Sequence, residues 1–291
     1  LEFEVLPRSS VEDCLAEINA LLDKAEKVGD NNTDVFYMST TAIKALRVEF
    51  ELHRGDYGRA VEVAESLLEG AESRWTRASF ENLWSGNESD ERIFAPYIFD
   101  SFYTDLCYDK ENGDYFVLNN EVRYNDEDVR KPWCEYPVEM ASGTVRSLGK
   151  DNRMYYENTT VRYINSIRYS GVCFAAAEAY ARDERPEKAI STVNRLLGSY
   201  GAELLDTSLR GDELIEAILK EKHKEFVGEG VRYFDLKRLG KPLNRYKNYG
   251  AGVSSVIQPD DYRWLFPIPE SEYKYNDLMY QNPEWPFIKT E

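Results

Sequence analysis

The chain has 291 residues, 42% of them hydrophobic, which is enough to bury a large core in one or two domains. Its 53 acidic and 36 basic side chains leave a formal net charge of −17. This negative balance argues against binding to nucleic acid or to an anionic membrane surface, because both attract clusters of Lys and Arg. The sequence also contains no apolar run of about 18 residues, the length that a membrane-spanning helix requires.

A first helical repeat region is predicted over residues 9–70. It opens with a capping box at residues 9–12, and an apolar stripe continues to about residue 28. A second helix is predicted over about residues 35–53, and the turn at 55–60 connects it to a return helix with alanines at the crossing. Small residues let two helices pack closely, as in a tetratricopeptide unit.

The helical period is lost over residues 73–163. This segment sets Trp, Tyr and Phe among Asn, Asp and Gly, and long irregular segments inside a compact domain usually carry function. Aromatic rings can stack on sugar rings while a few polar groups take the hydroxyls, so we predict a ligand-facing insertion. The alternative that each ring only fixes a loop stays open, above all for Trp84, which follows Phe80 at helical spacing. The candidate platforms are Trp133, Tyr136, Tyr103 and Trp84, with Arg130, Asn119 and Asn120 as polar partners.

A second helical repeat and a more unusual stretch make up residues 164–240. Residues 169–198 repeat the pattern of the first hairpin, with a proline-containing turn between the helices. In the stretch 214–240, apolar residues recur every three or four positions, which predicts an amphipathic helix. Gly228 and Gly230 interrupt this helix, because glycine costs about 1 kcal/mol in a helix interior.

Charged residues are concentrated around these two glycines. Paired carboxylates can act as acid and base, but the stretch contains no nucleophile, metal-ligand set or phosphate loop beside them. Arginine grips a carboxylate with two parallel hydrogen bonds, so we predict a structural clamp between two helices. Arg232 is expected to be buried at its centre. The predicted structural residues are Glu225, Glu229, Gly230, Arg232, Asp235 and Arg238.

The tail, residues 241–291, is rich in Tyr, Trp, Pro and Asn. Residues that precede proline avoid the helical conformation, so we predict an extended segment that packs back across the helices. Trp264 and Trp285 are interpreted as core anchors rather than ligand platforms, because aromatic side chains dominate core energetics.

The four cysteines form no CxxC pair, and the two histidines lie far apart in sequence, so neither a metal site nor a cofactor is expected. Cys14 and Cys173 fall on apolar helical faces, where a free cysteine packs as a small hydrophobe. Cys107 and Cys134 flank the irregular segment, and whether they pair stays open because four cysteines permit three connectivities.

Three motifs, in the same order, resemble those of a known family. The run EKHKEF at residues 221–226, continued by EGVRYFDLKR at 229–238, resembles the signature of the SusD/RagB family. LFPIPESE at 265–272 and QNP at 281–283 resemble the family's closing motifs. Val231 and Lys237 lie where the family varies, so they weaken the match little.

The resemblance implies a mainly α, SusD-like fold: tetratricopeptide-like hairpins, a long irregular insertion and an extended C-terminal segment. It implies that residues 1–291 form one domain without the family's N-terminal portion, which carries an export signal, a lipid-bearing cysteine and the first helices. Members of this family are surface lipoproteins of Bacteroidetes. The expected location is therefore the outer membrane, facing outward, with membrane contact only through a lipid anchor that is not in this chain.

The function that the resemblance implies is binding of a glycan or other nutrient and its delivery to a SusC-like TonB-dependent transporter, without catalysis. An alternative is a tetratricopeptide-like protein–protein scaffold, because such hairpins commonly bind peptides in a concave groove. A glycoside hydrolase would need two carboxylates on opposite sides of one cleft. The sequence nominates no such pair, so we expect no enzyme.

Overall fold

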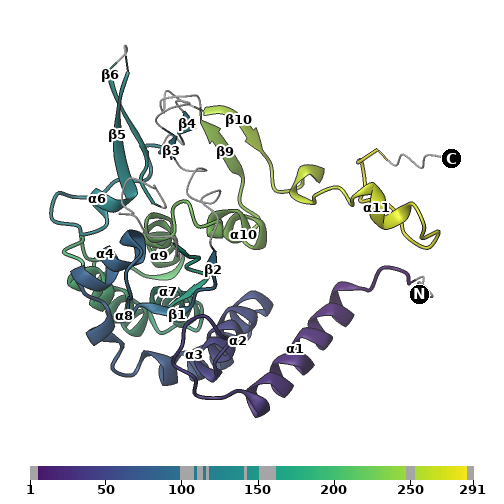
Figure 1. The fold of residues 1–291 in the computed structure, drawn as a ribbon, viewed down its shortest axis with the longest axis horizontal. Coiled ribbons are helices and arrows are strands. Elements are labelled where there is room, and N and C mark those ends of the chain that lie inside the picture. The colour runs from purple at the N-terminus through teal and green to yellow at the C-terminus, as the bar shows by residue number, and fades with distance from the viewer. Residues whose placement is uncertain are drawn as a thin grey trace.

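The computed structural model describes residues 6–98, 108–109, 114–115, 118–140, 143–150, 162–246 and 253–286. The fold is mainly α, and short strands join the helices (Figure 1). The helices are α1 (Val11–Val28), α2 (Thr40–Arg54), α3 (Tyr57–Leu68), α4 (Arg77–Ser85), α6 (Lys131–Cys134), α7 (Tyr169–Arg182), α8 (Pro186–Ser199), α9 (Gly211–Glu225), α10 (Val231–Arg238) and α11 (Glu270–Tyr273), with short 3-10 turns η1 (Ala71–Arg74) and η4 (Tyr262–Trp264).

The described strands form antiparallel pairs rather than a larger sheet. Residues 135–148 form the longest hairpin, in which Glu135 lies opposite Leu148 and Met140 lies opposite Gly143. The pairs are β1 (Arg92–Phe94) with β8 (Ile167–Arg168), β2 (Tyr97–Ile98) with β7 (Arg162–Tyr163), β3 (Tyr108–Asp109) with β4 (Asp114–Tyr115), β5 (Glu135–Met140) with β6 (Gly143–Leu148), and β9 (Leu243–Tyr246) with β10 (Val253–Ile257).

Helix α7 is the centre of the core. Eleven of its 14 residues are buried, and a run of alanines lets neighbouring helices approach closely. It packs against α2, α3, α8 and α9. The predicted hairpins are confirmed as α2–α3 and α7–α8, and Gly55, with φ of 83°, makes the left-handed turn after α2.

The N-terminal helices start later than the sequence predicts. Helix α1 is capped by Ser10, not Ser9: the Ser10 hydroxyl accepts the backbone N–H of Asp13 at 3.0 Å. Helix α2 begins at Thr40 rather than near residue 35, because successive Asn and Asp side chains accept backbone N–H groups and hold the preceding segment in turns.

No residue of α1 is buried. Polar contacts connect α1 to α2 instead: the Arg47 guanidinium of α2 donates to Asp23 and Asn19, each at 2.6 Å, and to Glu26 at 2.8 Å. The apolar side chains Val11, Ile18, Leu21 and Val28 of α1 are exposed.

Part of the region predicted to be irregular is helical. Helix α4 begins at the capping residue Thr76 and ends at Gly86, which is left-handed with φ of 77°. Its apolar face, Phe80, Leu83 and Trp84, is fully buried. The helical spacing of Phe80, Leu83 and Trp84 therefore indicated the structure correctly, and the prediction of irregular structure was wrong over these residues.

The C-terminal segment meets the helices at one place. The Tyr233 hydroxyl of α10 donates to the carbonyl of Trp264 at 2.7 Å, and the Tyr233 ring stacks on Phe266 with centroids 5.5 Å apart. Beyond this contact the segment runs away from α9 and α10, and α11 lies near the start of the chain (Figure 1), where Asn276 donates to the carbonyl of Leu6 at 2.9 Å. Packing across the helices is thus confirmed for η4 and wrong for α11.

Within the described ranges, no helix is both long enough and apolar enough to span a membrane.

Candidate functional site

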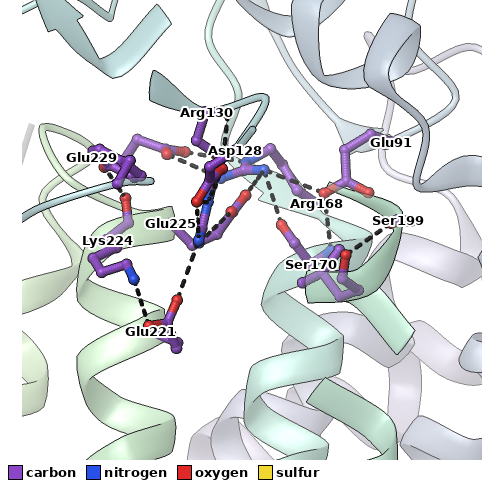
Figure 2. A network of polar contacts seen from close by, with 12 residues as sticks. Glu91, Asp128, Arg130, Arg168, Ser170, Ser199, Glu221, Lys224, Glu225 and Glu229 are labelled. Carbon is purple, nitrogen blue, oxygen red and sulfur yellow. Dashed lines mark hydrogen bonds and ion pairs between the residues drawn. The ribbon is translucent and has the colours of Figure 1, made fainter. Parts of the chain in front are cut away.

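A buried charge network joins the ends of β8 and α9 to the turn between α9 and α10 (Figure 2). Its centre is Arg168, which is 2% exposed. Its Nη1 donates to Glu225 Oε1 at 2.9 Å and to Glu91 Oε1 at 3.2 Å, and its Nη2 donates to Glu229 Oε1 at 2.9 Å. One guanidinium thus joins β8 to two segments that are distant in the sequence, at residue 91 and at residues 225–229.

A second buried arginine, Arg130, brings the insertion into the same network. Its Nη2 donates to Asp128 Oδ2 at 2.7 Å and to Glu221 Oε2 at 3.1 Å, and its Nη1 lies 3.6 Å from Glu225 Oε2. Lys150, which follows β6, pairs with Glu229 at 2.7 Å. The two ends of the β5–β6 hairpin are therefore attached to α9 and to the turn that follows it.

Burial and ion pairing act in opposite directions on these carboxyl groups. Burial alone would raise the pKa of Glu225, but Arg168, Arg130 and Lys150 outweigh it and hold this pKa below its ordinary value. Burial instead dominates at Glu91 and raises its pKa to about 7 against the opposing charge of Arg168. Among the described residues Glu91 pairs with one cation, Arg168, whereas three cations act on Glu225, which explains the difference.

A smaller cluster fixes α10 against α7 and α9. Arg238 Nη1 and Nη2 donate to the two carboxylate oxygens of Glu178 at 2.8 and 2.5 Å, a bidentate pair. Asp235 accepts from Lys222 at 3.1 Å and from Arg238 at 2.7 Å. Burial alone would raise the pKa of Asp235, yet these two cations hold it below its ordinary value.

The clamp predicted from the sequence exists, but Arg232 does not form it. Arg232 is partly buried and makes no ion pair with any residue of the described ranges. Its expected partners Glu225 and Glu229 are bound by Arg168, and Asp235 is bound by Lys222 and Arg238. Arg232, on α10, lies instead beside His223 and lines a polar cleft together with residues of α9.

Two of the seven candidate ligand residues are buried and cannot meet a ligand at the surface. Trp84 is 0% exposed in the core, with Lys150 Nζ 4.6 Å from its ring centroid. Arg130 is also 0% exposed and pairs with Asp128 and Glu221 in the network. Both interpretations as ligand groups were wrong: Trp84 is buried by helical packing, and Arg130 is bound by carboxylates, among them the distant Glu221.

The other candidates lie at different depths. Trp133 and Tyr136 are partly buried, and Trp133 packs against the main core. Asn119 Oδ1 accepts the backbone N–H groups of Glu121 and Val122, so this side chain builds a turn. Asn120 is exposed and lines a polar cleft. Tyr103 lies outside the described residues.

The tryptophans of the tail have structural contacts. Trp264 is 6% exposed, and its indole N–H donates to the carbonyl of Gln258 at 2.7 Å. The indole N–H of Trp285 donates to the carbonyl of Leu265 at 2.6 Å. Core anchoring is thus confirmed for Trp264, whereas Trp285 is only partly buried.

The cysteines divide by burial. Cys173 is buried in α7, as predicted, whereas Cys14 is exposed on α1, so its predicted packing was wrong. Cys134 is a free buried thiol, and burial raises its pKa to about 11. Cys107 lies outside the described residues.

In the described ranges, no group of three or more His, Cys, Asp or Glu side chains is arranged to hold a metal ion. The carboxylates of the network are occupied by Arg and Lys, which suits them to fixing the frame rather than to moving protons. Sequence reasoning missed Glu91, Lys150, Arg168 and Glu178 as members of these clusters. No local pattern marks them, because the contacts that join them to distant segments span at least 57 residues.

The surface holds several cavities with different linings. A polar cleft of about 630 Å³ lies between the 120–123 turn, α9 and Arg232. A cavity of about 290 Å³ lies between α2, α7, α9 and α10, and another of about 370 Å³ lies between α10 and the C-terminal segment.

Comparison with known proteins agrees with this architecture. The model of the SusD family matches residues 49–285. A SusD superfamily structure from Bacteroides vulgatus superposes with a TM-score of 0.85 at 22% identity, over 99% of this chain and 68% of that one. A second, from Bacteroides thetaiotaomicron, gives a TM-score of 0.79 at 23% identity, over 97% and 68% of the two chains.

A SusD-like carbohydrate binding protein from Bacteroides vulgatus has a TM-score of 0.76 at 19% identity, over 94% of this chain and 66% of that one. No curated protein matched the sequence. The structures establish the fold, and the family model covers most of the sequence. The chain therefore belongs to the SusD family.

Proposed function

We propose that this protein binds a glycan or other nutrient at the outer surface of the cell, without catalysis, and delivers it to a SusC-like TonB-dependent transporter. The observation that carries the proposal is the match of the SusD family model over residues 49–285. A structure of the same fold is described as a carbohydrate binding protein, which supports a glycan as the ligand. A lipid anchor at the outer membrane is part of the same proposal.

The frame suits binding better than turnover. Arg130 and Lys150 fasten the insertion to α9, so groups carried on its surface are held in place before a ligand arrives. A preorganised surface loses less entropy on binding than a mobile one. The candidate ligand residues that remain among the described residues are Trp133, Tyr136 and Asn120, and Tyr103 stays a candidate from the sequence alone.

Affinity electrophoresis of the purified chain against a panel of polysaccharides tests the proposal. We expect retardation by at least one polysaccharide and no release of reducing ends on long incubation. Turnover of the bound glycan would contradict the non-catalytic assignment. Retardation by none of the panel, in a chain that circular dichroism shows to be folded, would contradict glycan binding.

A protein–protein scaffold is the second candidate, and one observation favours it. Exposed apolar side chains lie on α1 and α10 and in the C-terminal segment, where Phe234 is 59% and Phe266 is 67% exposed. Patches of this kind often mark protein contacts. The partner that fits is a second copy of this chain, because α1 is itself a helix with exposed apolar side chains.

Light scattering over a range of concentrations distinguishes the scaffold. If these residues form a contact surface, the chain should self-associate as its concentration rises, and Phe234→Lys should abolish the association. Leu204→Lys is the matched control, because Leu204 is 55% exposed but follows α8 in the chain and belongs to neither α1, α10 nor the C-terminal segment. A chain that stays monomeric at every concentration would count against the scaffold.

A further inference from the structure

Arg232 is the one cation of the predicted clamp that the structural role does not use. It is partly buried at the start of α10, makes no ion pair within the described ranges, and lines the polar cleft of about 630 Å³. An arginine in such a place keeps its full set of N–H donors in a fixed fork, which matches the two oxygens of a carboxylate-like group.

The other charges of the cleft are unevenly matched. Arg123 donates only to the amide oxygen of Asn120, at 2.8 Å, and Lys220 is exposed with no ion pair in the described part of the chain. On the acidic side, Glu216 pairs with Lys241 and Glu221 pairs with Lys224 and Arg130. Those two carboxylates are therefore already neutralised.

Apart from Lys224, which is already paired, three cations line the cleft: Arg123, Lys220 and Arg232. Neither Lys220 nor Arg232 has an ion pair within the described ranges. Burial and the nearby charge of Arg232 lower the pKa of His223 to about 4, so this ring is neutral at pH 7 and can donate or accept a hydrogen bond. These groups favour an anionic ligand.

The net charge of −17 does not prevent such binding. At physiological ionic strength, charges separated by more than about 8 Å are largely screened, so the local groups decide. Among the described residues no Trp, Tyr or Phe lines the cleft, so the large rings that usually stack on a neutral sugar are not found in its lining. Recognition in this cleft must depend on charge and hydrogen bonds.

We propose that the cleft between α9, Arg232 and the 120–123 turn binds a sugar that carries an oxyanion group, a carboxylate or a sulfate ester, with Arg232 as the main contact. This inference rests on the proposed function, because it names the class of glycan that the protein takes.

Isothermal titration calorimetry with three oligosaccharides of equal length tests it: an oligogalacturonate, a sulfated galactose oligosaccharide and a neutral galactose oligosaccharide. We expect at least one charged form to bind at least about tenfold more tightly than the neutral one. Whichever charged form binds identifies the oxyanion group. Raising the salt concentration should weaken its binding, because the contact is electrostatic.

Arg232→Gln should reduce binding of the charged form about tenfold or more, while Arg232→Lys, which keeps the charge but loses the fork, should fall between the two. Both variants should melt like the wild type, since Arg232 holds no ion pair in the described structure. Arg263→Gln is the matched control: its side chain is 49% exposed, pairs with Asp261 and does not line the cleft.

The outcomes separate the two proposals. Tight binding of the neutral oligosaccharide that Arg232→Gln leaves unchanged would overturn the charged-sugar assignment and leave glycan binding in place. Binding of neither these oligosaccharides nor any polysaccharide of the panel would overturn both.

Discussion

Replacing Arg168 with methionine should destabilise the fold strongly. Methionine keeps much of the side-chain length but removes the charge, and it leaves the buried carboxylates of Glu91, Glu225 and Glu229 without their shared cation. Glu225 keeps Arg130 at 3.6 Å, and Glu229 keeps Lys150 at 2.7 Å. Glu91 has no other ion pair within the described ranges, so most of the lost folding stability should come from its unpaired carboxylate.

Breaking a buried ion pair by removing one partner costs about 3–5 kcal/mol. Unfolding entropy scales at about 2.1 cal/mol/K per residue near 60 °C. For 291 residues this gives about 0.6 kcal/mol/K, so the melting temperature should fall by about 5–8 °C. Urea denaturation at pH 7, with the midpoint and slope fitted separately, measures the same loss as a free energy.

A double variant locates the cost. Arg168→Met combined with Glu91→Gln should recover part of the lost stability, because the second change removes the unpaired carboxylate. Arg263→Gln, at an exposed pair with Asp261, is the control and should shift stability by less than about 1 kcal/mol. If Arg168→Met melts within about 1 °C of the wild type, the network does not hold the fold together as described.

Three further predictions concern Glu91, Gly228 and Trp133. The pKa of Glu91 is raised to about 7 in the fold, so its contribution to stability is fully present below its unfolded pKa and is lost as pH rises through 7. Urea denaturation from pH 4.5 to 7.5 should therefore show the stability difference between wild type and Glu91→Gln changing by roughly 3 kcal/mol. A pH-independent difference would show that Glu91 does not titrate in this range. A Cβ added at Gly228, where φ is 81°, would lie 2.6 Å from Leu148, so Gly228→Ala should lower the free energy of unfolding by about 2–4 kcal/mol. Gly230 is also left-handed, but no atom lies within 4 Å of an added Cβ, so Gly230→Ala should cost about 1 kcal/mol. Equal losses in thermal denaturation would contradict the close approach at Gly228. Trp133→Ala should weaken binding of the identified glycan and also lower stability by about 1–3 kcal/mol, because the ring packs partly on the core; unchanged affinity would remove Trp133 as a platform.

The sequence by itself determined the helical frame and the family. The hairpins α2–α3 and α7–α8 follow from apolar spacing of three and four with small residues at the crossings, and these signals are local. The glycines at 228 and 230 separate α9 from α10 as predicted, because a left-handed backbone conformation is a property of the residue itself. The motifs at 221–238 and 265–283 indicated the SusD family for the same reason, since each is a short run of neighbouring residues.

Only the tertiary structure decided which charges meet. Glu225, Glu229 and Asp235 were correctly expected to be paired, but the sequence assigned them to Arg232, their neighbour in the chain. Their cations are Arg130, Lys150, Arg168, Lys222 and Arg238, and three of these five come from elements far from the signature. Ion pairing depends on distance in space, and side chains about 60–90 residues apart carry no local pattern that joins them.

The same limit separates the tryptophans and arginines of the insertion. Arg130 has neighbours in sequence that look like those of an exposed loop, and Trp84 lies at the edge of the aromatic-rich segment, yet both are fully buried. Burial of a ring or a guanidinium depends on what packs over it, and here that cover comes from Lys150, Arg168 and the end of α9. Composition selected the residue types that bind sugars, and the packing of distant segments decided which of them remain at the surface to do so.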